Sequence, residues 1–418
     1  MSLTRRLRQQ GRSARRRGQV LLHTLGPGLI AGAADDDPSG IATYSQAGAR
    51  FGLAMLWTTV LTFPLMVGIQ MVSARIGRVS GVGVAANLRA HYPPALAIAI
   101  ACLLLVANVI DLGADLAAMA AAVQLVAGGS YHLYVVGFAA FSLALQVFVP
   151  FPRYAPILKL LTLSRLADAA TVFFVQVDWC QVIASSLTPK LAWDPRYIGM
   201  LVAVLGTTIS PYLFFWQAGQ EVEELHASER GQALKHAPET AWQHLRRIKI
   251  DTYLGMGFSN LVALFIMLAT AAALNAHGVT DIQTSREAAQ ALRPVAGEWA
   301  FLLFTLGIVG TGLLAVPVLA GSAAYAVAEA LGWRGSLAVE LRAAKGFYGI
   351  IAAAMLVGVV LDFNDVDPIR ELYWSAVING VIAVPIMAVM MLLGQRADVM
   401  GPFVVTRRLR VLGCWRPA

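Results

Sequence analysis

The stretch Ala34-Asp35-Asp36-Asp37-Pro38-Ser39-Gly40 places three consecutive carboxylates and a proline inside an otherwise apolar segment. A carboxylate within a membrane span costs about 3 kcal/mol or more unless it meets a partner or water, so such residues mark sites where something is bound or moved. Pro38 has no N–H group, and its ring clashes with the carbonyl oxygen four residues earlier, that of Ala34. The stretch therefore predicts a broken helix with free backbone groups beside the carboxylates, and we interpret the break as half of a cation site.

The composition around this stretch is that of a polytopic membrane protein. Of the 418 residues, 58% are hydrophobic and only 13% are charged, whereas an ordinary soluble domain has about 25% charged residues. Hydropathy predicts ten spans, at residues 21–48, 53–76, 95–125, 132–150, 156–177, 198–219, 250–275, 298–329, 344–362 and 369–394. We expect an all-α transmembrane domain over residues 21–394, with basic tails at 1–20 and 395–418.

The net charge of +8 follows the predicted topology. If the N-terminus is cytoplasmic, most of the 32 Lys and Arg residues fall in cytoplasmic segments, as the positive-inside rule requires. Both tails are then cytoplasmic, and they face the anionic lipid headgroups of the cell (inner) membrane. Because the membrane explains the basicity, we expect no nucleic acid as a partner. The three scattered cysteines match neither a disulfide framework nor a metal motif. We expect no cofactor and no obligatory protein partner.

A second helix break is predicted five spans after the first. The stretch Gly206-Thr207-Thr208-Ile209-Ser210-Pro211-Tyr212 carries a proline that frees the carbonyl oxygen of Thr207. Two interrupted helices at matching places in two halves of opposite orientation indicate an inverted-repeat transporter with a site near the bilayer midplane. A cation between the breaks could meet Asp37, the backbone oxygens of Ala34 and Thr207, and water. A packing kink at Pro211 is the alternative, because prolines are common in membrane helices.

Asp37 is the leading ligand among the three consecutive aspartates. Successive helix positions differ by about 100°, so Asp35, Asp36 and Asp37 cannot all face one point. We assign Asp37 and Asp36 to the metal site and Asp35 to the permeation pathway, where it would line a vestibule. A solvated hairpin is the alternative, but residues 41–49 are too few to cross a bilayer at about 1.5 Å per residue.

Two further aspartates lie in the span at 95–125. Asp111 and Asp115 are four residues apart and therefore share one face of a helix. This arrangement suits a water-lined path, a proton relay or the attraction of ions, so we place both residues on the permeation or coupling pathway. Pairing with Arg165 in the span at 156–177 is the structural alternative, although Asp168 is a nearer partner for that arginine.

These motifs resemble those of a known family. Gly26-Pro27-Gly28, Asp37-Pro38-Ser39-Gly40 and Gln46-Ala47-Gly48-Ala49 are similar, in the same register, to the first-helix signature GPG, DPGN and QAGA of the Nramp divalent-metal transporters. The span around Pro211 resembles the family's second broken helix, with its pattern of roughly AxxMPH. The resemblance covers the ten-span core. It implies a LeuT-type 5+5 inverted repeat with broken helices 1 and 6, and alternating access around a midplane metal.

The resemblance also implies roles for individual residues. Asp37 takes the position of the family's metal-binding aspartate, and Thr207 takes that of the residue that offers a backbone carbonyl. Gly40 stands where the family has an asparagine ligand, and Ser210 stands where it has a methionine ligand. This chain therefore lacks two of the family's metal ligands.

The family's proton pathway is also altered in this sequence. Tyr212 replaces the histidine that follows the proline, and Ala118 replaces the glutamate of the family's DxxE pattern, while Asp115 keeps the aspartate. Coupling to protons is therefore not expected.

The missing ligands favour a hard cation. Without a thioether the site is made of oxygen alone, which suits Mg²⁺, Mn²⁺ or Ca²⁺. With fewer protein ligands it also fits an ion that keeps several waters, as Mg²⁺ does. This pattern is most similar to that of the divergent Nramp-related magnesium transporters. The predicted function is uptake of Mg²⁺, and also of Mn²⁺, by alternating access.

Other functions remain open at this point. The same fold could carry Mn²⁺ or Fe²⁺ together with protons. An amino-acid substrate is disfavoured, because its carboxylate would want a helix N-terminus with little acid nearby. An intramembrane aspartyl protease would need two carboxylates that share a proton, such as Asp37 and Asp115. The residues before Asp115 do not match the GxGD pattern of such enzymes, so we expect no enzymatic activity.

Overall fold

The computed structural model describes residues 26–149, 153–154, 178–228, 231–282, 284–290, 297–333, 335–363 and 367–405. Within these residues every element of regular secondary structure is a helix. The basic tail at 1–20, most of the tail at 395–418, and the predicted span at 156–177 with Arg165 and Asp168 lie outside the described residues.

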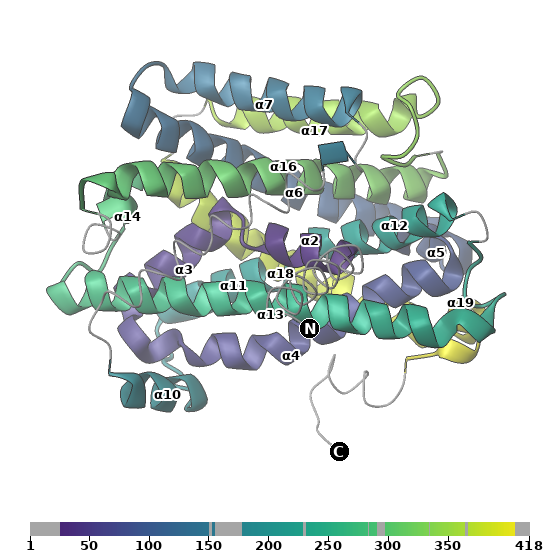
Figure 1. Ribbon diagram of the computed structural model, residues 1–418, viewed down its shortest axis with the longest axis horizontal. Coiled ribbons are helices and arrows are strands. Elements are labelled where there is room, and N and C mark those ends of the chain that lie inside the picture. The colour runs from purple at the N-terminus through teal and green to yellow at the C-terminus, as the bar shows by residue number, and fades with distance from the viewer. Residues whose placement is uncertain are drawn as a thin grey trace, which may run out of the picture.

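The long helices run side by side along the long axis of the molecule (Figure 1). Their bounds are α2 Pro27–Asp35, α3 Pro38–Phe51, α4 Trp57–Ser80, α6 Pro94–Ala127, α7 Tyr131–Phe148, α11 Pro195–Thr208, α12 Pro211–Ala227, α13 Ala241–Ala273, α16 Ala300–Leu331, α17 Lys345–Leu361 and α18 Pro368–Gly394. Shorter α-helices are α5 Val84–His91, α10 Trp179–Leu187, α14 Ser285–Gln290 and α19 Ala397–Met400. Single 3₁₀ turns are η1 Gly52–Met55, η3 Pro238–Thr240, η4 Asn275–His277, η5 Gly297–Trp299 and η6 Gly401–Phe403.

The described helices match the predicted multi-pass membrane protein. Seven helical segments are apolar and long enough to cross a membrane. The pair α2–α3 and the helix α17 cover two more of the predicted spans, and the tenth is the segment outside the described residues. The clearest difference in bounds is at α13, which begins at Ala241 rather than at residue 250. Hydropathy detects only the apolar part of a helix, so it missed the polar first turns of α13.

Both predicted helix breaks are present. The chain leaves helical geometry between Asp35 and Pro38, and again between Thr208 and Pro211. Each proline is the first residue of the helix that follows, where its missing N–H group costs no hydrogen bond. By contrast, Pro64, Pro317 and Pro385 lie inside continuous helices. The packing-kink alternative for Pro211 is therefore wrong.

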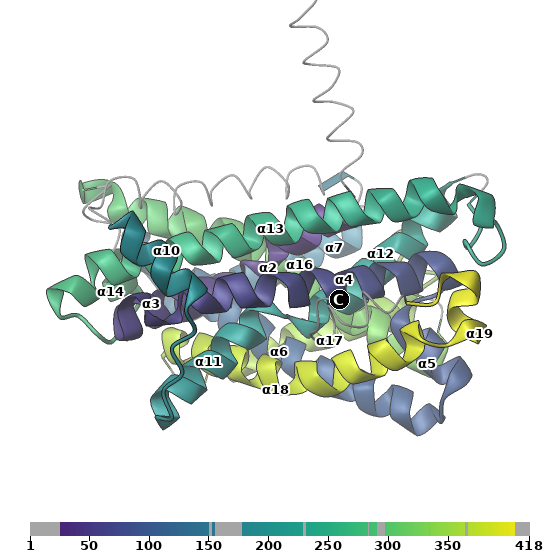
Figure 2. The ribbon, with the colours of Figure 1, turned by 90° about the horizontal axis from the view of Figure 1, so that it is seen from below.

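Glycine contacts bring the broken helices close to their neighbours. A Cβ atom on Gly32 of α2 would lie 2.2 Å from the backbone of Gly255 on α13, and one on Gly206 of α11 would lie 2.0 Å from the carbonyl oxygen of Ala376 on α18. Only residues without a side chain allow backbones to approach this closely. Figure 2 shows the result, with α13 along one edge of the bundle, α18 along the opposite edge and the broken helices between them.

Candidate metal site

The site is built around Asp37, which is the N-cap residue of α3. Its Oδ1 atom accepts hydrogen bonds from the hydroxyl of Ser39 and the backbone N–H of Gly40, both at 2.7 Å. Pro38 cannot donate such a bond, so the carboxylate satisfies the next donors of the helix start. The other oxygen, Oδ2, lies 3.3 Å from the hydroxyl of Tyr212. The break thus fixes the position of the Asp37 carboxylate, which is only 1% exposed.

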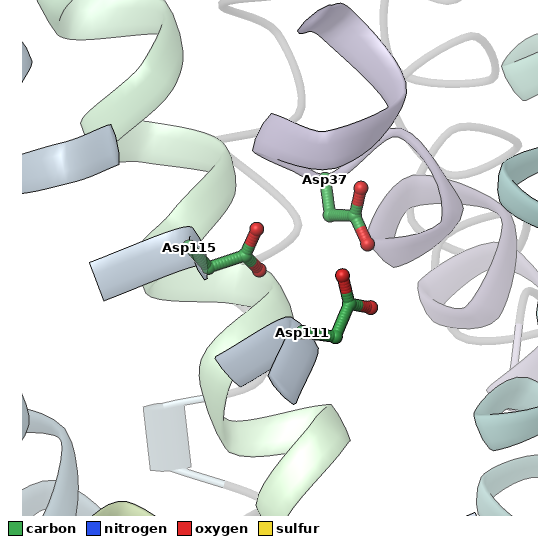
Figure 3. A group of neighbouring side chains, drawn as sticks. All are labelled: Asp37, Asp111 and Asp115. Atoms are coloured by element: carbon green, nitrogen blue, oxygen red, sulfur yellow. The ribbon is translucent and has the colours of Figure 1, made fainter. Parts of the chain in front are cut away.

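Two carboxylates from α6 complete an acidic group with Asp37. One oxygen each from Asp37, Asp111 and Asp115 lies within 4.8 Å of the other two, and all three residues are buried. Figure 3 shows the three carboxylates directed toward a shared space, Asp37 from the break and the two others from consecutive turns of α6. Among the described residues, this is the only group of three or more His, Cys, Asp or Glu side chains that could hold a metal ion.

Helix α18 holds Asp111 in this group. The Ser375 hydroxyl donates to Asp111 Oδ1 at 2.7 Å, and the Asn379 amide donates to Asp111 Oδ2 at 3.1 Å. Ser375 and Asn379 are four residues apart and therefore share the face of α18 that packs toward α6. Two donors from a neighbouring helix fix the carboxylate beside Asp37.

The second break meets the first at this point. The Tyr212 hydroxyl donates to the carbonyl oxygen of Ala34 at 2.7 Å, and the Ser210 hydroxyl donates to the carbonyl oxygen of Thr207 at 2.8 Å. Both carbonyl oxygens belong to residues that the sequence nominated as backbone ligands. A carbonyl oxygen has two lone pairs, so each can accept a hydrogen bond and still offer a lone pair to a cation.

Asp35 and Asp36 face a different helix from Asp37. The Ser259 hydroxyl of α13 lies 2.7 Å from Asp35 Oδ2 and 3.1 Å from Asp36 Oδ1. Neither aspartate belongs to the group formed by Asp37, Asp111 and Asp115. The sequence argument that three successive aspartates cannot face one point is confirmed, because Asp37 turns toward α6 and the other two turn toward α13.

Sequence reasoning missed several residues that shape the site. Ser39, Ser375 and Asn379 each donate a hydrogen bond to one buried aspartate, and Ser259 contacts two of them. The spacing of Ser375 and Asn379 in an apolar span was a usable signal, because two polar residues four apart mark one polar face. Nothing in the sequence pointed to Asp111 as their partner.

The chemistry of this arrangement is that of an oxygen-donor cation site. Three carboxylates, hydroxyl groups and backbone carbonyl oxygens surround it, and no sulfur or imidazole is among the residues just described. Carboxylates this close together repel one another in a medium of low dielectric constant, so a bound cation relieves that repulsion. Such a set of oxygen donors suits a hard divalent ion.

Comparison with known families identifies the chain. The family model described as natural resistance-associated macrophage protein-like (Nramp) matches residues 28–416. The chain belongs to the Nramp family. The match includes both broken helices and the three clustered aspartates, so the resemblance inferred from the motifs is confirmed. Nramp proteins are transporters, and the expectation that this chain is not an enzyme holds.

Curated Nramp relatives align over nearly the full chain. A protein from Acidiphilium cryptum (strain JF-5), named divalent metal cation transporter MntH, is 27% identical over 403 residues, covering 91% of this chain and 84% of that protein. A protein of the same name from Klebsiella pneumoniae (strain 342) is 27% identical over 412 residues, covering 97% of this chain and 94% of that protein.

Solved structures confirm the fold. The Eremococcus coleocola manganese transporter, in complex with an aromatic bis-isothiourea substituted compound, superposes with a TM-score of 0.73 at 19% identity, covering 95% of this chain and 84% of that one. Mhp1, a nucleobase-cation-symport-1 family transporter in a closed conformation, gives a TM-score of 0.55 at 14% identity, covering 93% and 81%. The chain therefore has the predicted LeuT-type 5+5 inverted repeat with broken helices 1 and 6.

Proposed function

We propose that this Nramp-family protein moves divalent metal cations across the membrane, with Mg²⁺ as the main substrate and Mn²⁺ as a second one. The observation that supports this proposal most directly is the group formed by Asp37, Asp111 and Asp115, with ligand oxygens within 4.8 Å of one another. The names of the MntH relatives support divalent metal transport in general. The preference among divalent ions rests on the chemistry of the site.

The spacing of the three carboxylates suits a partly hydrated ion. Mg²⁺ binds oxygen at about 2.1 Å in octahedral geometry, so two oxygens on opposite sides of the ion lie about 4.2 Å apart. Oxygens within 4.8 Å of one another can therefore reach such an ion directly or through one retained water. Mg²⁺ gives up its waters reluctantly, which favours a site with a few carboxylates over a complete protein cage.

The absence of a thioether at Ser210 also supports Mg²⁺ as the main substrate. The family position that carries a methionine is a serine here, and its hydroxyl donates to the Thr207 carbonyl oxygen. A soft sulfur ligand favours late transition metals over abundant hard cations. We propose Asp37, Asp111, Asp115, Thr207, Ser210 and Ala34 as the groups closest to the ion. Asp36, Asp35 and Tyr212 would lie along its path.

The position of the site between four half-helices supports alternating access. Helices α2 and α12 lie toward one end of the bundle and α3 and α11 toward the other (Figure 1). Rocking of these elements would expose the buried aspartates to each side in turn. The basic segments favour cytoplasmic termini, contact with anionic lipid and a place in the cell (inner) membrane.

We propose that transport is not coupled to protons. Ala118, which replaces the family's glutamate, lines a small cavity of about 10 Å³ together with Ile41, Phe304 and other largely apolar side chains. A cavity of that size holds at most one water, and alanine cannot carry a proton. The second candidate is a proton-coupled Mn²⁺ or Fe²⁺ symporter, which is favoured by the match of Asp115 to the aspartate of the family's DxxE pattern and by the manganese transporter of the same fold.

Reconstituted uptake tests the substrate site. Asp37→Asn removes a charged ligand, and we expect it to lower the initial rate of Mg²⁺ uptake into liposomes about tenfold or more. Asp111→Asn should also lower the rate, whereas Asp398→Asn, which changes an exposed carboxylate, should not. Uptake by Asp37→Asn at the rate of the parent protein would contradict the site. Uptake of Mn²⁺ but not Mg²⁺ by the parent protein would favour the second candidate.

A further inference from the structure

The start of α2 is capped by a carboxylate from another helix. The backbone N–H groups of Gly26, Gly28 and Leu29 donate to the carboxylate of Asp251 on α13 at 3.0, 2.7 and 3.1 Å. The N-cap residue Gly26 has no side chain of its own to serve this role. Helix starts carry unpaired donors and a partial positive charge, so a buried carboxylate at that position binds strongly. Asp251 is only 1% exposed.

Glycine contacts extend this attachment along α2. A Cβ atom on Gly28 would lie 2.9 Å from Asp251 Oδ2, and one on Gly255 would lie 2.2 Å from the carbonyl oxygen of Gly28. One turn further on, Gly32 of α2 touches the backbone of Gly255. The half-helix that leads into the aspartate break therefore lies directly against α13.

The same region of α13 also holds the end of α12. Arg247, one turn before Asp251, donates to Glu221 of α12 at 2.6 Å and also pairs with Glu224. Glu221 is fully buried. Arg78 of α4 adds a contact with His244 of α13 at 2.7 Å and lies 3.8 Å from Glu224. The buried carboxylate of Glu221 holds Arg247 more firmly than an exposed ion pair would, because removing one partner would leave a buried charge unpaired.

These contacts join the two half-helices that border the site at one end of the bundle. Helix α2 precedes the break at Asp37, and α12 follows the break at Pro211. Both are attached to neighbouring turns of α13, and Figure 1 shows them over the same half of that helix. The attachment lies at the end of the bundle that the charge distribution predicts to be cytoplasmic.

We propose that Asp251 and Arg247 form a latch on α13, and that release of the α2 start from Asp251 opens the metal site toward this end of the bundle. The proposal rests on the alternating-access function proposed above. Both residues are positioning residues, since neither touches the ion. When the latch is closed, α2 stays against α13 and Asp35 and Asp36 remain at Ser259. When it opens, α2 moves away from α13 and Ser259 becomes accessible to water.

Cysteine accessibility tests the latch without any transported metal. Cys102, Cys180 and Cys414 are first replaced by alanine, and Ser259→Cys is introduced as the reporter between α13 and the aspartates. Asp251→Asn keeps the shape of the side chain but removes the negative charge at the helix start, and loss of that charge shifts a two-state equilibrium about fivefold. We expect a membrane-impermeant thiol reagent to modify Ser259→Cys about fivefold faster from the latch side in Asp251→Asn.

A matched control is available at the other end of the bundle. Asp178 caps α10 by accepting hydrogen bonds from the backbone N–H groups of residues 180 and 181, and Asp178→Asn should leave the modification rate unchanged. Arg247→Lys, which keeps the charge but cannot bridge Glu221 and Glu224 in the same way, is a second variant and should give an intermediate acceleration. Equal modification rates in the parent protein and in both latch variants would overturn the proposal.

The outcome separates the latch from the substrate assignment. If the latch variants accelerate modification while the parent protein takes up no Mg²⁺, the latch stands and the substrate assignment fails. If Mg²⁺ uptake depends on Asp37 while modification rates are unchanged in both latch variants, the substrate assignment stands and the latch fails.

Discussion

At the scale of single residues, the chemistry of the site depends on Ser210. Its side chain is buried beside the second break and donates to the Thr207 carbonyl oxygen. A serine offers oxygen where the family offers sulfur, and this difference sets the expected order of metals. Among the proposed ligands, the carboxylates would then contribute most to binding.

Restoring the thioether should change the selectivity. We expect Ser210→Met to raise the ratio of Mn²⁺ to Mg²⁺ uptake rates about tenfold, because the added ligand favours the softer ion. Competition between the two ions in liposome uptake measures the ratio. Ser210→Leu is the matched control, since leucine has a similar size without sulfur. If Ser210→Leu changes the ratio as much as Ser210→Met does, size rather than softness controls selectivity.

At the scale of elements, the contact between α11 and α18 links the second break to the acidic group. Gly206 and Gly380 let the two backbones approach, and a Cβ atom on Gly206 would lie 2.0 Å from the Ala376 carbonyl oxygen. Helix α18 carries Ser375 and Asn379, which hold Asp111. A displacement of α18 would therefore move a carboxylate of the site.

Crowding this contact should weaken both stability and transport. We expect Gly206→Ala to destabilise the protein by about 1–3 kcal/mol, because an overpacked helix contact forces the backbones apart, and to raise the KM for Mg²⁺. Thermal unfolding and uptake kinetics measure the two effects.

The control is Gly257→Ala on α13, where the nearest atom to a new Cβ is 3.5 Å away on Phe63. There alanine, which has a higher helix propensity than glycine, should stabilise the protein by up to about 1 kcal/mol. A Gly206→Ala protein as stable and as active as Gly257→Ala would show that the close approach is not needed.

At the scale of the whole molecule, the proposed transport carries charge. Moving a divalent cation without a compensating ion is favoured by about 4.6 kcal/mol for every 100 mV of inside-negative potential, which is twice the value for one charge. We expect an imposed inside-negative potential to speed Mg²⁺ uptake into liposomes while the lumenal pH stays constant. A pH-sensitive dye inside the liposomes measures the lumenal pH. Acidification of the lumen in proportion to Mg²⁺ entry would contradict uncoupled transport, and Asp37→Asn liposomes give the background leak.

The fold was largely predictable because its signals are local. Apolar stretches predicted the spans. Pro38 and Pro211 predicted the breaks because a proline lacks an N–H group and clashes with the carbonyl oxygen four residues earlier, and both stand beside polar residues within a span, unlike Pro64, Pro317 and Pro385 in their continuous helices. The short helices α5, α10 and α14 were not predicted, because they are too short to give the hydropathy signal of a membrane span. The early start of α13 was missed because its first turns are polar, and with it Arg247 of the proposed latch.

The site was predictable only in part. The sequence alone determined the broken helix and the burial of its carboxylates, because charges in an apolar span and a proline act through their immediate neighbours. The leading place of Asp37 among the ligands is a prediction. The tertiary structure decided that Asp111 and Asp115 join Asp37 and that Asp35 and Asp36 turn to Ser259 on α13. It also decided that Asp251 caps α2. These pairings join residues far apart in the chain, and they depend on how the helices pack and rotate against one another, which hydropathy and spacing do not encode.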